Sequence, residues 1–355
     1  MSANSKIEWT DHTFNYWEGC QKTGPGCDNC YAETRNARFA GIKVNGINIA
    51  PNWGPGAPRR LTSESNRNLP AKWNREHAAF FAKHGRRQRV FCSSLSDVFD
   101  NQVPREWRWD LWQLIMATPN LDWLLLTKRI GNVNAMLKEP GAPINGLPSN
   151  VWLGATIVNQ EEADRDIPKL LDVPASVRFL SMEPLLGPVS LRWLAAWPEN
   201  APTRAQKPGG ITNHLDGLRR LDWVIVGGES GPKARPMHPD WALHLRDQCA
   251  EAGVPFLYKQ WGEWKPISQM AEAEHTALYR SRVKAMPHES QDAIDDINGR
   301  ACTVPYGVVH ADGSLHEPLE PMAFLQGTGA MTTFKIGKKA AGRLLDGIEH
   351  NGYPR

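Results

Sequence analysis

The sequence predicts an α/β fold: a complete or partial (β/α) barrel, TIM-like, with six or seven parallel strands and a C-terminal extension. Three observations predict it. Short apolar runs recur at intervals of roughly thirty residues, the period of a β-α-β unit. Helical patterns separate these runs, and no GxGxxG sequence opens a helix, as a dinucleotide-binding sheet would require. Polar residues follow the runs, at strand ends that a barrel gathers on one face.

The individual elements follow from local patterns. A first strand is expected near residues 13–17, and a helix over residues 31–41 ends in glycine, which favours helix C-termini. Two later helices are expected at residues 104–116, with Pro104 in the first turn, and at residues 240–252. The remaining strands are continuously apolar, as expected where helices cover both faces of a sheet. They are expected at residues 89–94, 121–129, 151–157, 177–183, 221–230 and 254–260.

The alternation of apolar runs and helical patterns ends after Trp264, so the chain is predicted to have two parts. Residues 1–264 form the barrel, and residues 265–355 form the extension. Within the extension a hairpin is expected near residues 304–315, because Asp312-Gly313 is a hairpin turn sequence. A basic helix is expected over residues 334–347.

Composition narrows the class of protein. The chain has 355 residues with 41% hydrophobic and 22% charged residues, so a substantial core is expected. A net charge of +3 is too small to indicate nucleic-acid binding by bulk charge. No run of 18 apolar residues and no signal-peptide pattern is present, so a cytoplasmic protein that does not enter a membrane is expected. The fifteen tryptophans are assigned to core packing.

Three of the six cysteines, Cys20, Cys27 and Cys30, lie within eleven residues in the pattern C-x6-C-x2-C. The segment 23–26 between them is turn-forming, with glycines that permit positive φ and a proline that fixes φ. Such a loop is expected to fold back so that the three sulfurs converge. In a reducing compartment a cysteine cluster of this density favours a metal site over unrelated thiols.

Two kinds of metal site compete for this loop. A structural zinc site needs a fourth protein ligand, for which His12 and Cys92 are candidates. A [4Fe–4S] cluster held by three cysteines instead leaves one iron open to bind a small molecule. The cysteines alone do not choose between them. The predicted position of the loop, over a ring of polar strand ends, favours a functional site.

Seven segments of the chain match the sequence pattern of a known family. They are residues 7–11, 19–20, 25–33 (Pro-Gly-Cys-Asp-Asn-Cys-Tyr-Ala-Glu), 180–187, 222–231, 259–262 and 337–347, and they span nearly the whole chain. In these segments the chain resembles a phage-associated three-cysteine-motif family of uncharacterised proteins that is grouped with the radical S-adenosylmethionine (SAM) superfamily. The usual radical SAM spacing is C-x3-C-x2-C, and this sequence has six residues in the first gap.

The resemblance implies a radical SAM enzyme in which Cys20, Cys27 and Cys30 hold a [4Fe–4S] cluster. The cluster would bind SAM and cleave it after reduction by a reductant protein, and the resulting radical would take hydrogen from a substrate. The polar strand ends would then contact the cofactor or substrate. Expected contacts are Ser93, Ser94 or Asp97 with the SAM amino group, Thr156 and Asn159 with the ribose, Glu183 and Glu229 with a polar end of the cofactor or substrate, and Tyr31 with the cluster or adenine.

The alternative is a non-catalytic nucleic-acid-binding protein with a structural zinc knuckle. The basic run at residues 86–89, the basic C-terminal helix and the tryptophans favour it. A hydrolase is not indicated, because neither HExxH nor GxSxG occurs. The substrate of the radical SAM enzyme is not defined by any motif. Its phage association favours a nucleic acid or a nucleotide, by analogy alone.

Overall fold

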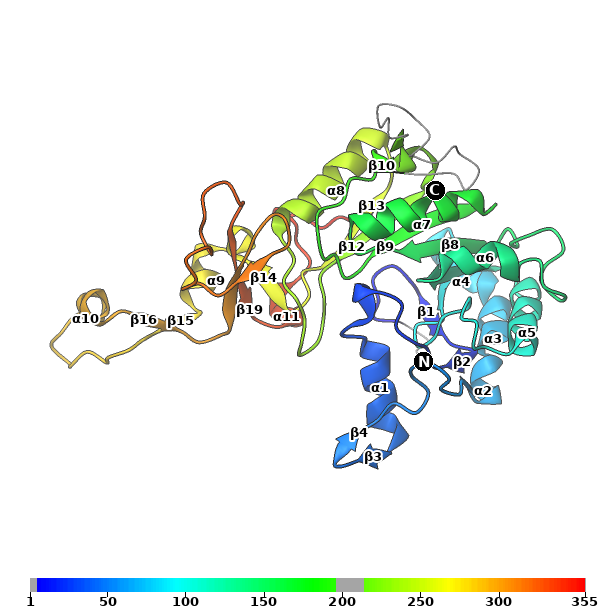
Figure 1. Ribbon diagram of the computed structural model, residues 1–355, viewed down its shortest axis with the longest axis horizontal. Helices are drawn as coiled ribbons and strands as arrows, with labels where there is room; N and C mark the ends of the chain where they lie inside the picture. The colour runs from blue at the N-terminus through cyan, green and yellow to red at the C-terminus, as the bar shows by residue number, and fades with distance from the viewer. Residues whose placement is uncertain (1–4, 196–213, 355) are drawn as a thin grey trace, which may run out of the picture.

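The computed structural model describes residues 5–195 and 214–354 of the chain. Its centre is a seven-stranded parallel sheet that curls into a half-barrel (Figure 1). The strand order is β1-β6-β7-β8-β9-β12-β13, so β1 and β13 are its two edges. The predicted α/β fold with parallel strands is therefore confirmed, and the barrel is a partial one. The strands are β1 (His12–Phe14), β6 (Gln88–Cys92), β7 (Leu121–Thr127), β8 (Val151–Thr156), β9 (Val177–Met182), β12 (Trp223–Gly227) and β13 (Phe256–Gln260).

The strands follow the apolar runs of the sequence because both faces of the sheet are buried. Leu125, Leu153 and Val224 point to the outer face and contact the helices. Phe179 and Trp223 point to the inner face, where aromatic side chains fill the lower part of the half-barrel. Burial of these large rings supplies much of the apolar area removed from water on folding.

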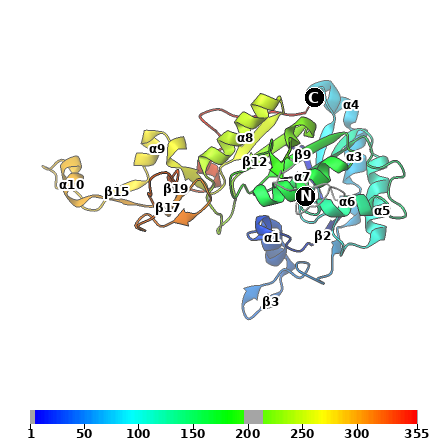
Figure 2. The ribbon, with the colours of Figure 1, turned by 45° about the horizontal axis from the view of Figure 1, so that its top comes forward.

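Most helices of the half-barrel cover its outer face, whereas α1 (Tyr31–Ala40) lies on the inner side (Figures 1 and 2). Helix α1 ends at Gly41, whose φ of 68° is left-handed, as predicted. The outer helices include α5 (Arg105–Met116) and α8 (Pro239–Ala252), which also match their predicted spans closely. The others are α2 (Glu64–Arg67), α3 (Leu69–Arg75), α4 (His77–His84), α6 (Ile130–Met136) and α7 (Gln160–Asp172).

The first strand is shorter than predicted. It ends at Phe14, because the Asn15 side chain turns away to accept a hydrogen bond from the Leu95 N–H at 2.7 Å. The chain then pairs as β2 (Trp17–Glu18) with β5 (Arg60–Leu61). Between these strands, β3 (Lys43–Val44) and β4 (Ile47–Asn48) form an exposed hairpin.

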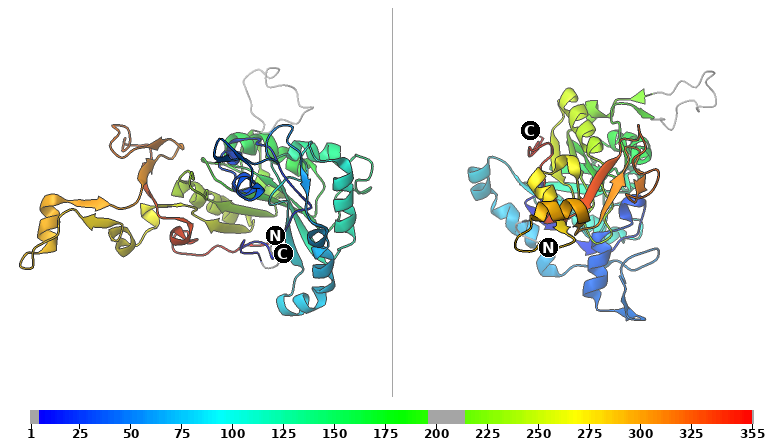
Figure 3. Two further views of the ribbon diagram at one scale, coloured as in Figure 1. Left: turned by 90° about the horizontal axis from the view of Figure 1, so that it is seen from below. Right: turned by 90° about the vertical axis from the view of Figure 1, so that its left-hand side faces the viewer.

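After β13 the architecture changes to antiparallel sheet. Four strands pair in the order β14-β19-β17-β18, and the β17–β18 pair is the predicted hairpin near residues 304–315. A two-stranded arm projects from this sheet with α10 (Gln291–Asn298) at its tip (Figure 3). The strands are β14 (Trp264–Pro266), β15 (Tyr279–Ser281), β16 (Arg300–Cys302), β17 (Tyr306–Val309), β18 (Leu315–His316) and β19 (Met331–Lys335), with α9 (Glu272–Thr276) between β14 and β15.

The predicted basic helix over residues 334–347 is wrong. Phe334 belongs to β19, and α11 (Lys338–Ala341) has only four residues. Gly337 and Gly342 flank it with φ of 86° and 72°, a left-handed backbone that stops a helix at both ends. In the described part of the chain no helix is long and apolar enough to cross a membrane.

The last residues return to the half-barrel. The predicted division at residue 264 falls between β13 and β14, yet Asn351 pairs with Leu257 on the free edge of β13. Tyr353 donates a hydrogen bond to the Glu8 carbonyl at 2.7 Å, and its ring lies 4.2 Å from the Arg89 guanidinium carbon. The segments around Glu8 and Tyr353 therefore meet at the open side of the half-barrel.

Candidate functional site

A cavity of about 670 Å³ opens at the C-terminal ends of the parallel strands. Because side chains alternate along a strand, each strand presents its last inward residues to this space. The floor of the cavity is formed by aromatic side chains that fill the lower part of the half-barrel, among them Trp9 and Phe91. The polar residues that line it from the strand ends include Thr13, Ser93, Lys128, Thr156, Ser181, Glu183 and Lys259.

The cysteine loop, residues 20–30, crosses one side of this cavity and leads into α1. Gly26 packs so closely on the end of β8 that a Cβ atom would lie 2.7 Å from Val158 Cγ1. Gly24 is extended, with φ of −173°, and a Cβ there would lie 2.7 Å from Glu162 Oε1. The prediction that these glycines serve a positive φ is therefore not met. They are needed because the loop lies against the sheet without room for side chains.

All three thiols of the loop line the cavity. Cys20 Sγ accepts a hydrogen bond from Arg129 Nη1 at 3.4 Å. Burial raises the pKa of Cys20 to about 11, with Asp97 adding to the rise and Arg129 opposing it. Burial also raises the pKa of Cys30, while the Glu33 and Ala32 N–H groups at the start of α1 oppose this effect.

The donor set of the loop suits a thiolate-ligated metal group, because Arg129 donates to Cys20 and the first N–H groups of α1 are directed at Cys30. The sulfurs share one cavity wall but do not meet at a point. Over residues 5–195 and 214–354, no three His, Cys, Asp or Glu side chains are placed to hold a single metal ion.

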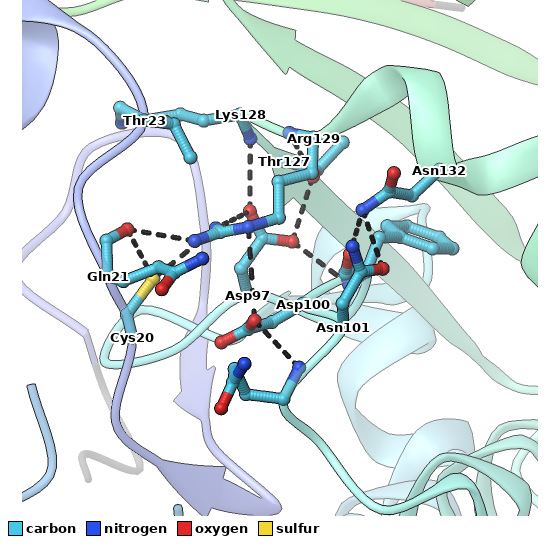
Figure 4. Close-up of polar contacts among 12 residues, drawn as sticks. Cys20, Gln21, Thr23, Asp97, Asp100, Asn101, Thr127, Lys128, Arg129 and Asn132 are labelled. Atoms are coloured by element: carbon cyan, nitrogen blue, oxygen red, sulfur yellow. Dashed lines mark hydrogen bonds and ion pairs between the residues drawn. The ribbon is translucent and has the colours of Figure 1, made fainter. Parts of the chain in front are cut away.

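Arg129 fastens the Cys20 end of the loop to the sheet (Figure 4). Its guanidinium donates to Asp97 Oδ2 at 3.1 Å and to the Gln21 carbonyl at 2.8 Å, in addition to Cys20. Asp97 also accepts from Thr127 Oγ1 at 2.8 Å and from the Lys128 N–H at 3.1 Å. The side chains of Arg129 and Asp97 are both buried, so each charge depends on the other and on these hydrogen bonds for stabilisation.

Arg235 fastens the other end of the loop to β12. It donates to the Pro25 carbonyl at 2.9 Å and pairs with Asp28 at 3.1 Å and with Glu229 at 2.7 Å. Asn29 Nδ2 completes the link by donating to Glu229 Oε2 at 3.1 Å. Burial alone would raise the pKa of Glu229, but the hydrogen bonds from Arg235 and Asn29 lower it below its usual value. Glu229 is thus an ionised anchor for the loop.

Glu183 and Lys259 form an ion pair across β12. Lys259 Nζ lies 2.6 Å from Glu183 Oε2, and both residues line the cavity. The pair spans Gly227, where a Cβ atom would lie 3.0 Å from Glu183 Oε1. That second oxygen is buried and has no hydrogen-bond partner among the described residues. A buried acceptor without a partner is costly, and Asp97 and Glu229 have no such oxygen.

The structure brings most of the other predicted residues to the cavity. Ser94 Oγ accepts from Asn15 Nδ2 at 2.9 Å, and the Ser94 carbonyl accepts from the Tyr31 hydroxyl at 2.5 Å. Thr156 Oγ1 accepts from Lys128 Nζ at 3.4 Å. Ser93 is buried and left-handed, with φ of 69°. Each of these residues lines the cavity.

Three residues considered from the sequence lie elsewhere. Asn159 caps α7 by accepting from the Glu162 N–H at 2.9 Å, and it does not line the cavity. His12 stacks on Trp73 at 4.0 Å between ring centroids, and Cys92 is buried in the outer core. The two candidates for a fourth zinc ligand are therefore both remote from the loop.

Sequence reasoning missed Arg235 and Asn29, which hold the loop in place. No local signal marks Arg235 as a contact of the loop, because Pro25 and Asp28, its partners in the loop, lie more than two hundred positions away in the sequence. Arg129 is the last residue of the strand predicted over residues 121–129. Its place just beyond the end of β7 is a signal that points toward the cavity.

The fold and the site define a class: a (β/α) half-barrel protein with a thiol-bearing loop over a polar cavity at the strand ends. The chain belongs to the family described as "protein of unknown function (DUF5131)", whose profile matches residues 4–354. Searches of curated proteins and of solved structures found no match. The family description specifies neither a cofactor nor a reaction.

Proposed function

We propose that this protein is a radical SAM enzyme whose [4Fe–4S] cluster is held by Cys20, Cys27 and Cys30. One observation carries the proposal: three thiols from a single loop line one cavity, at the polar face of a parallel half-barrel. When bound, this cofactor pair supplies reductive cleavage of SAM and hydrogen abstraction by the resulting radical. The six cysteines are free, which suits a reducing cytoplasm where a reductant protein delivers the electron.

The residues around the loop hold the ligands and balance their charge. Arg129 and Arg235 fix the two ends of the loop, so its three sulfurs keep their place over the strand ends. Lys128 and Arg129 lie near Cys30 and Cys20, where they offset the negative charge of ligating thiolates. The aromatic floor below keeps water away from the reacting atoms.

The strand ends would bind the polar groups of SAM and substrate. The unsatisfied Oε1 of Glu183 accepts a hydrogen bond from an ammonium group or a ribose hydroxyl. Ser93, Ser94 and Thr156 add hydroxyl groups around the same space, and Tyr31 adds an aromatic face. The carboxylate oxygens of Asp97 and Glu229 already accept hydrogen bonds from protein groups, so the role of these residues is to position Arg129 and the loop.

Anaerobic reconstitution with iron and sulfide tests the proposal. The expected result is a brown protein with an absorbance near 400 nm that cleaves SAM after reduction. Cys27→Ala should abolish both properties. Cys302→Ala is the matched control, because Cys302 lies in β16, outside the cavity, and should leave them unchanged. Uptake of zinc alone, with no SAM cleavage and no effect of Cys27→Ala, would contradict the assignment.

The zinc-knuckle alternative has less support in the structure. The arginines of its basic run already form ion pairs within the protein: Arg86 pairs with Asp11 at 2.6 Å and Arg87 with Asp122 at 2.7 Å. Arg89 is buried against Trp152 and Tyr353. These residues lie at the start of β6, at the opposite end of the strands from the cysteine loop.

A further inference from the structure

The charged residues that line the cavity are not balanced. Most of them are already paired: Asp97 with Arg129, Glu183 with Lys259, Glu229 with Arg235, and Arg35 with Glu18. Lys6, Lys128 and Lys338 also line the cavity, and none of them lies within 4.0 Å of a carboxylate in the described parts of the chain. Glu8 is the one lining carboxylate there without a cationic partner. Three ammonium groups thus stand against a single carboxylate.

Two of these lysines flank the open side of the half-barrel. Lys6 precedes β1, and its segment is held by a hydrogen bond from the Ser5 N–H to the Asp11 carbonyl at 2.8 Å. Lys338 begins α11, which is tied to the β13 side by a hydrogen bond from the Trp261 N–H to the Gly342 carbonyl at 3.1 Å. Because β1 and β13 are the two edges of the sheet, the lysines lie on either side of the gap.

The third lysine and the aromatic residues lie further inside. Lys128 extends from the end of β7, and its Nζ lies 3.4 Å from Thr156 Oγ1. Tyr31, 59% exposed, and the half-buried Trp53 are aromatic residues that line the same cavity. Unpaired ammonium groups attract phosphate, and exposed rings stack on bases of any sequence.

We infer that the substrate of this site is a nucleotide-containing phosphate ester, either a mononucleotide or a nucleic-acid single strand. Its phosphates lie against Lys6 and Lys338 at the opening, and a base stacks on Tyr31 or Trp53. A bound polyanion neutralises these two ammonium groups, which have no carboxylate partner in the described parts of the chain. This inference rests on the proposed function in one respect: it names the substrate class of that same site.

Fluorescence anisotropy of a labelled twelve-residue oligothymidylate, titrated with the full-length chain at several salt concentrations, tests the inference. For single strands, each phosphate bound by a cationic side chain adds about 0.7 to the steepness with which log K falls against log salt. Lys6→Ala and Lys338→Ala should each reduce this slope by about that amount, and the double variant by about twice as much. Lys339→Ala is the matched control, because Lys339 neighbours Lys338 on α11 but does not line the cavity.

Competition with dTMP and with pyrophosphate separates the two sources of phosphate. If either displaces the oligothymidylate at similar concentration, the site takes a mononucleotide. If neither does, it takes a strand. Failure of all three probes to bind, or an equally reduced slope in Lys339→Ala, would overturn the inference. The assay needs no reductant and no SAM cleavage, so its failure is distinct from failure to assemble a cluster.

Discussion

Glu183 differs from Asp97 and Glu229 in having one carboxylate oxygen without a hydrogen bond. The other oxygen is held by Lys259 at 2.6 Å, and the pair is largely buried. Burying an ion pair is costly unless further hydrogen bonds complete it. We therefore regard the pair as incomplete in the free protein and completed by a ligand donor, which makes Glu183 the most specific polar contact that the cavity offers.

Replacing Glu183 with glutamine should weaken SAM binding by about tenfold, because one charge-assisted hydrogen bond is removed. Calorimetric titration of the reconstituted protein with SAM measures this change. The free energy of unfolding should also fall, by about 1–3 kcal/mol, since Lys259 keeps a charge without its partner. The double variant Glu183→Gln with Lys259→Gln should recover that stability but not the binding. Recovery of both would show that the pair is only structural.

His12 gives the molecule a predictable response to pH. Its ring is buried against Trp73 and bonded to Gln88 at 2.6 Å, and burial lowers its pKa below the usual value of about 6.5. The unfolded chain therefore takes up a proton first as the pH falls. The neutral, buried His12 ring therefore contributes fully to the free energy of unfolding above about pH 6.5. This contribution is lost progressively as the pH falls through the pKa of His12 in the folded protein.

Urea unfolding between about pH 8 and about pH 5 checks this response. The midpoint for the natural chain should fall once the pH passes below about 6.5, and His12→Gln should show a flatter profile over the same window. Parallel profiles for the two proteins would rule out His12 as the titrating group.

At the scale of elements, the cysteine loop is placed by contacts from β7 and β12 rather than by its own sequence. Arg235 joins Pro25 and Asp28 of the loop to Glu229, which follows β12. A guanidinium makes these contacts together because its donors are fixed in one plane, whereas an ammonium is a single point charge.

Arg235→Lys should therefore loosen the loop while the half-barrel stays folded. Hydrogen exchange should rise in residues 20–31 and remain unchanged in the parallel strands, and reconstituted iron content should fall. Arg246→Lys is a matched control, since Arg246 also joins two carboxylates, Asp247 and Asp346, but on the surface of α8. Equal exchange in the loop of both variants would exclude a positioning role for Arg235.

The sequence predicted the strands well because each is apolar on both faces and bounded by polar residues. Strand β7 begins at Leu121 as predicted, and β9 covers the predicted apolar run from Val177. It failed at α11, where glycines with left-handed backbone interrupt a helical composition. Local composition does not reveal such a conformation. Nor does it reveal that Gly26 lies against Val158, which is a contact between distant segments.

The candidate site was predictable only in part, for the same reason. Parallel strands place their C-terminal ends on one face, so the positions of Thr156 and Glu183 in the sequence were enough to assign both to one site. Which side chains form ion pairs within that site depends on their geometry. Asp97 was a candidate ligand from sequence, but in the structure Arg129 and Thr127 occupy its oxygens.

For the whole molecule, the half-barrel leaves the edge of β13 unpaired unless another segment covers it. An exposed edge strand invites association with other chains. The C-terminal tail covers this edge, with hydrogen bonds from the Tyr258 N–H to the His350 carbonyl at 3.0 Å and from the Gly352 N–H to the Phe256 carbonyl at 2.9 Å. Trp223 Nε1 also donates to the Gly352 carbonyl at 2.7 Å, from inside the half-barrel.

Deletion of residues 349–355 should therefore destabilise the half-barrel. The three hydrogen bonds contribute about 1 kcal/mol each, and removal of the Tyr353 contacts with Arg89 and Glu8 adds to this. Calorimetry should show a lower melting temperature, and light scattering should show association through the free edge of β13. Deletion of residues 354–355 is the control, because Tyr353 and the tail pairing remain. A truncated chain that melts with the control and stays monomeric would mean that the edge is protected by other means, and that the half-barrel is stable without its ends joined.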